Sequence, residues 1–76
     1  MIKTYYLCQL GYEMPPAFPT LKSAREALRE AVNDSLETAV RRGHKSARKH
    51  KLSKDSYRIT LGRDLDSTIY SQFSIQ

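Results

Sequence analysis

A chain of 76 residues can form one small domain and leaves no room for a second, so we expect a single domain over residues 1–76. Its hydrophobic share of 39% and charged share of 28% exclude a chain that is disordered throughout. The formal net charge is +5, and the single cysteine, Cys8, excludes an intrachain disulfide and favours a reducing compartment, so we expect the cytoplasm.

The N-terminal segment is predicted to be one β-strand over residues 2–12, because apolar and aromatic side chains alternate along it. One alternating set is Tyr6, Cys8 and Leu10, and the other is Tyr5 and Leu7. The apolar run is too short for a signal-peptide core or a membrane-spanning helix, so we expect no membrane association. Residues 11–19 hold all three prolines, which remove backbone donors, and are predicted to form a loop.

One long helix is predicted over residues 20–42. Thr20 suits its N-cap and Gly43 its left-handed C-cap. Apolar residues recur between them at intervals of three and four and cover an arc of about 140° on one face; they are Leu21, Ala24, Leu28, Ala31, Val32, Leu36 and Ala39. The polar step at residues 33–35 would suit a helix-turn-helix, but the apolar spacing keeps its phase across it, which favours one continuous helix.

A basic segment over residues 41–54 carries seven of the thirteen basic residues and no acid. The seven are Arg41, Arg42, Lys45, Arg48, Lys49, Lys51 and Lys54. The remaining residues of the chain sum to −2, so the positive charge is local. Because these cations repel one another, we expect the segment to be partly disordered, with one or two further helical turns as the alternative.

The C-terminal third is predicted to be a β-hairpin with strands over residues 56–62 and 67–75, which alternate in polarity around a turn-forming stretch. The element order is then β-α-β-β. It predicts a two-layer α+β fold in which a three-stranded antiparallel sheet packs on one long helix.

Each face of this predicted sheet has an expected set of side chains. The face against the helix is expected to hold Tyr6, Cys8, Leu10, Tyr57, Ile59, Leu61, Ile69, Phe73 and Ile75. The uncovered face is expected to hold Tyr5, Leu7, Arg58, Thr60, Tyr70 and Gln72. Four of these, Tyr5, Leu7, Arg58 and Tyr70, form a candidate interface for a homodimer or another partner. Stacking of bases on Tyr5 and Tyr70 is a further alternative.

The basic segment is the strongest functional signal. Clustered cations attract polyanions, so our leading hypothesis is a binding module that contacts nucleic acid non-specifically, largely through phosphates. Arginines would bind phosphate through two parallel hydrogen bonds and lysines as point charges. The alternatives are a solvated connection without a ligand, or a small protein-binding regulator or inhibitor of the phage or mobile-element type that recognises an acidic protein through the basic segment and the uncovered face. DNA and RNA are not distinguished.

Catalysis, metal binding and cofactor binding are not expected. His44 and His50 stand six residues apart among cations, a spacing that matches no common zinc pattern. Cys8 is expected in the core. The carboxylate pairs on the helix and in the turn of the hairpin should be exposed, where they lack the desolvation that general acid-base chemistry requires. The sequence therefore predicts a non-catalytic protein.

Overall fold

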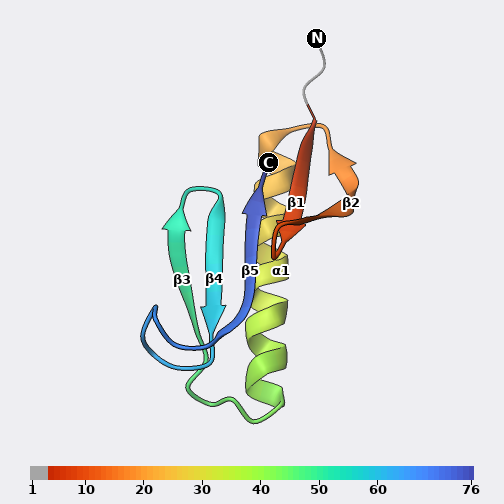
Figure 1. Ribbon diagram of the computed structural model, residues 1–76. Helices are drawn as coiled ribbons and strands as arrows, with labels where there is room; N and C mark the ends of the chain where they lie inside the picture. Colours follow the sequence, from red (N-terminus) through yellow and green to blue (C-terminus); the bar gives the residue numbers. More distant parts are fainter. Residues whose placement is uncertain (1–3) are drawn as a thin grey trace.

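Five antiparallel strands form one sheet, and one helix lies across one of its faces in the computed structural model, which describes residues 4–76 (Figure 1). The elements are β1 (Tyr5–Gln9), β2 (Tyr12–Phe18), α1 (Leu21–Arg41), β3 (Arg48–Ser53), β4 (Ser56–Thr60) and β5 (Ile69–Ile75). The strand order is β2-β1-β5-β4-β3. The two-layer α+β architecture is present, but the predicted three-stranded sheet is wrong, because β2 and β3 are additional strands at the two edges.

The N-terminal segment is a hairpin rather than one strand over residues 2–12. β1 ends at Gln9, which pairs with Tyr12, and the chain turns through Leu10 and Gly11 at φ 52° and 86°. A two-residue hairpin turn of this kind requires positive φ at both central positions, and Asn-Gly is its usual signature. Here Leu10 stands at the first turn position in place of asparagine, so the sequence does not show the usual signature. Residues 2 and 3 of the predicted strand lie outside the described residues.

β2 occupies most of the stretch that was expected to be a loop. It contains Pro15 and Pro16, joined by a cis peptide bond. Proline cannot donate to a neighbouring strand, but an edge strand has a neighbour on one side only and tolerates it. The pairing register between β1 and β2 also shifts between Tyr5 and Leu7, opposite the prolines. Prolines therefore place this segment at the edge of the sheet instead of excluding it from the sheet.

α1 runs without a break through Asn33 and has a defined cap at each end. The Thr20 hydroxyl oxygen accepts from the amide of Ser23 at 3.1 Å. At the C-terminus Gly43 has φ 101°, its amide donates to the carbonyl of Val40, and the amide of His44 donates to the carbonyl of Ala39. This pair of bonds is a Schellman motif, which satisfies the last helical carbonyls.

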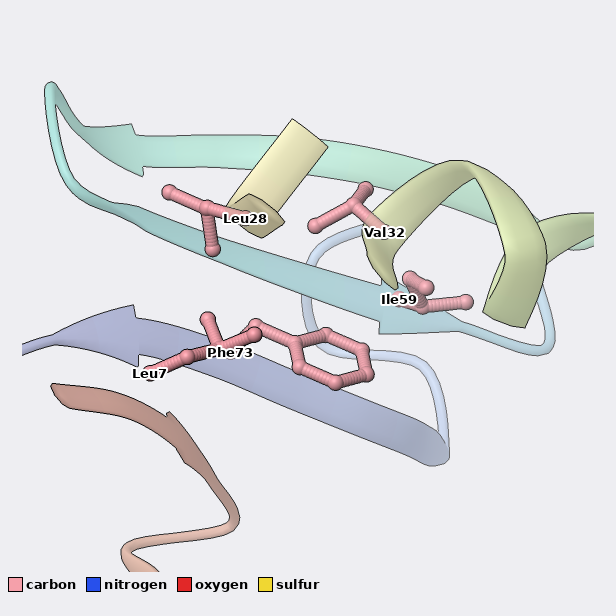
Figure 2. Packing of buried hydrophobic residues seen from close by; sticks show 5 residues of the cluster. All are labelled: Leu7, Leu28, Val32, Ile59 and Phe73. Carbon is pink, nitrogen blue, oxygen red and sulfur yellow. The ribbon is translucent and has the colours of Figure 1, made fainter. Parts of the chain in front are cut away.

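The core lies between α1 and the centre of the sheet (Figure 2). Leu28 and Val32 point from the helix towards Ile59 of β4 and Phe73 of β5, as predicted, whereas Leu7 of β1 belongs to the same cluster and is only 7% exposed. The expected faces of β1 are thus reversed. Alternation defines two sets of side chains but not which set is inside, and both sets of β1 contain apolar residues.

Candidate polyanion-binding surface

The basic segment is ordered. This differs from the partial disorder that its repelling charges predicted. Arg41 ends α1, Arg42 is its C-cap, Lys45 lies in the following turn and Lys54 lies in the turn between β3 and β4. The remaining three cations, Arg48, Lys49 and Lys51, belong to β3, which pairs antiparallel with β4. The segment thus connects the C-terminal end of α1 to one edge of the sheet (Figure 1).

Strand alternation separates the cations of β3 onto two sides. Lys49 pairs with the core residue Ile59 and Lys51 with Tyr57, so both lysines lie on the side of the helix. Arg48 and His50 occupy the alternate positions and lie on the other side, which we call the open face. Neighbouring charges on one side are then about 6.6 Å apart along the strand instead of about 3.3 Å. This separation reduces the repulsion that made disorder the expectation.

On the open face of β3, β4 and β5, fixed hydrogen bonds orient the polar side chains. Arg58 donates through Nε to Gln72 Oε1 at 3.1 Å. The Thr60 hydroxyl donates to the carbonyl of Gly62 at 2.7 Å, so its oxygen accepts from His50 Nε2 at 2.9 Å. Thr60 is fully buried, and the connection after β4 passes across the lower ends of β3 and β4 (Figure 1). None of these three strands contains an acidic residue.

Only one of the four candidate interface residues lies on the open face, and this residue is Arg58. Leu7 is in the core. Tyr70 packs against the core and its ring lies 6.1 Å from that of His44, because the register shifts between Ile59 and Thr60 and turns Tyr70 towards the helix. Tyr5 alternates with Leu7 and interacts electrostatically with Arg25 of α1. The expected pair of tyrosine rings for base stacking is therefore not on the open face.

Within residues 4–76, two ion pairs join carboxylates to cations. Arg25 Nε lies 2.8 Å from Asp55 Oδ1, and this hydrogen bond raises the pKa of Arg25. Arg41 Nη2 lies 2.7 Å from Glu37 Oε1. Consequently six of the seven cations of the basic segment have no carboxylate partner in the described part of the chain. Lys49 Nζ instead donates to Asn33 Oδ1 at 3.1 Å.

Other candidate chemistry is sparse. Cys8 is fully buried, and burial together with the charge of Glu13 raises the pKa of its thiol, which favours the unreactive protonated form. Among the described residues no three His, Cys, Asp or Glu side chains are grouped as metal ligands would be. No helix of residues 4–76 is long and apolar enough to cross a membrane.

Comparison of the chain with protein-family models, with curated proteins and with solved structures found no match.

Proposed function

We propose that the protein is a non-catalytic module that binds the phosphate backbone of nucleic acid through the cations of residues 41–54, with little sequence selectivity. The observation that supports this most directly is the set of six cations held on ordered elements without a carboxylate partner in the described part of the chain. Cations that are not neutralised internally remain available to phosphates. Because their backbone is already ordered, binding loses less conformational entropy than binding by a mobile segment.

The part of the open face formed by β3, β4 and β5, next to the basic segment, favours backbone contacts over base stacking. Single-strand binders gain much of their affinity from bases stacked on aromatic rings. The tyrosines and phenylalanine of β4 and β5, namely Tyr57, Tyr70 and Phe73, pack against the core on the helix side. We therefore propose a duplex as the preferred ligand, since it presents the higher density of phosphates.

The test is a titration of labelled duplex and single strands at salt concentrations from about 50 to 200 mM. If four to six phosphates are neutralised, the logarithm of the affinity should fall with the logarithm of salt at roughly −0.9 per phosphate. The double variant Arg48→Gln, Lys49→Gln should flatten this slope by about two units. The single variants Arg48→Gln and Lys22→Gln give a matched comparison, because both remove one exposed charge and only Arg48 belongs to the basic segment.

Failure of the wild-type protein to bind any duplex or single strand near 50 mM salt would refute the proposal. The rival is a small regulator that recognises an acidic protein surface. It is favoured if the same double variant loses capture of one specific protein while nucleic acid is absent. The unfolding free energy of the double variant should stay within about 0.5 kcal/mol of wild type, because both side chains are exposed.

A further inference from the structure

Two polar contacts show how α1 lies against the β3–β4 hairpin. At one end Arg25 bonds to Asp55 in the turn after β3. At the other end Asn33 accepts from Lys49 near the start of β3. From the first contact to the second, residue numbers rise along α1 and fall along β3, so the helix and the edge strand run antiparallel to each other. The two elements are in contact.

From this register we infer that Arg29 lies opposite Lys51. Arg29 is four residues from both Arg25 and Asn33, so it lies on the same side of the helix, about 6 Å along the axis from each. Lys51 is two residues from Lys49 on the same side of β3, also about 6.6 Å further along. Two exposed cations therefore face each other between the two contacts.

No carboxylate of the described chain neutralises this pair. Asp55 bonds to Arg25, and the ion pairs within residues 4–76 include neither Arg29 nor Lys51. On the helix, Glu26 and Glu30 lie about 60° and 100° around the axis from Arg29, turned away from β3. Like charges that face each other destabilise a fold, and an anion bound between them reduces this repulsion.

We propose that Arg29, Lys49 and Lys51 together bind one phosphate group at the exposed surface where α1 and β3 lie side by side. Asn33 contributes as well: its carbonyl oxygen already accepts from Lys49, which leaves its amide nitrogen free to donate to an anion. This inference rests on the proposed function for the source of the phosphate, a nucleic-acid backbone, but free phosphate has the same chemistry. Arg29 lies outside the basic segment, and its role depends on the packing of the helix against the hairpin.

The first arm of the test uses inorganic phosphate. In chloride, Lys51→Gln should raise Tm by about 1–2 °C, because it removes the facing like charge. Replacing chloride by phosphate at matched ionic strength should raise Tm of the wild-type protein more than that of Lys51→Gln or Arg29→Gln. The matched control is Lys22→Gln, an exposed lysine of α1 outside the basic segment, which should respond to phosphate as the wild type does. Equal changes in Tm for the wild type and both site variants would overturn the inference. Phosphate also stabilises proteins in general, but that effect is the same for all variants and drops out of the comparison.

The second arm identifies the source of the phosphate with a labelled duplex. The double variant Arg29→Gln, Lys51→Gln should lose about tenfold or more in affinity, as expected for charge-assisted hydrogen bonds. The charge-matched double variant Lys45→Gln, Lys54→Gln should lose clearly less. If wild type binds phosphate but no duplex, the site holds free phosphate and the proposed function fails while the inference stands. If the duplex binds but the phosphate responses are equal, the inference fails and the proposed function stands.

Discussion

The two edge strands of the sheet are protected in different ways. β2 carries Pro15 and Pro16, which remove backbone donors, and β3 carries Arg48, Lys49 and Lys51, whose charges repel a second strand. Proline protects an edge without leaving anything for a ligand to bind. Cations protect an edge and also attract anions, so the cations of β3 have a structural explanation before any functional one. Edge protection does not explain Arg29, a helix residue that we infer to lie opposite Lys51.

The two hairpins also differ in what fixes them. The β1–β2 turn depends on a strained leucine, Leu10, whereas the β3–β4 turn has no residue with positive φ and is tied to α1 by the Arg25–Asp55 pair. Each hairpin nevertheless contributes one buried side chain to the same core cluster, Leu7 from the first and Ile59 from the second.

The largest effect is expected for alanine at either core position. Leu7→Ala and Ile59→Ala should each lower the unfolding free energy by about 2–4 kcal/mol, because each leaves a cavity in a buried cluster. Chemical denaturation measures the loss. The control is Leu52→Ala on β3, where the side chain is exposed and the change should stay within about 0.5 kcal/mol. A Leu7 variant that behaves like the control would restore the face of β1 that alternation first suggested.

Replacing the lysines of β3 or the prolines of β2 by valine should leave the corresponding sheet edge open to pairing with a strand of another molecule. Lys49→Val with Lys51→Val, and Pro15→Val with Pro16→Val, should each increase light scattering, since each restores an apolar or hydrogen-bonding edge. The lysine variant should scatter more, because it also lowers the net charge. The control, Lys22→Val with Glu30→Val, exposes two valines on a helix. Equal scattering by the control would assign the effect to surface hydrophobicity rather than to strand edges.

The sequence locates the helix and the β4–β5 hairpin because their signals are local. Thr20, Gly43 and the apolar spacing mark α1 to within a residue at each end. The two edge strands escape prediction for opposite reasons. β2 contains residues that a central strand excludes, and β3 contains charges that repel one another unless alternation separates them, so both depend on a neighbouring strand that the local sequence does not reveal.

The candidate site is predictable only in part. A run of cations identifies residues 41–54, but the side on which each cation of β3 lies follows from the register with β4. The role that we propose for Arg29 requires the packing of α1 against β3 and has no local signal. The exposed tyrosine pair was an error of the same kind, because a one-residue shift in β5 turns Tyr70 to the helix.

A smaller effect is expected in the turns. Leu10→Asn should raise the unfolding free energy by about 0.5–1 kcal/mol, because asparagine adopts positive φ more readily than leucine. Lys54→Asn provides the comparison in the other hairpin, whose turn has no positive φ, and should change little. Thermal or chemical unfolding distinguishes them. Equal changes in unfolding free energy for the two substitutions would show that backbone strain at Leu10 does not distinguish the first hairpin from the second.

The smallest effect is expected where the basic segment already has an internal partner. The pair between Arg41 and Glu37 is exposed and separated by four residues on α1, so Glu37→Gln should lower the unfolding free energy by only about 0.3–0.5 kcal/mol. The same substitution frees Arg41 for phosphate, and the affinity for a duplex should rise by about twofold. A lower unfolding free energy together with a higher duplex affinity would show that Glu37 stabilises the fold and competes with phosphate for Arg41.

Glu13→Gln on the proline edge separates this local effect from one of net charge. It removes the same charge from an exposed residue of β2, far along the sheet from β3. Its affinity should rise less than that of Glu37→Gln. If both variants gain equally at 50 mM salt, where surface electrostatics are strongest, the gain reflects the overall charge of the protein. The proposed contrast between a cationic edge that binds phosphate and a proline edge that only protects the sheet would then be lost.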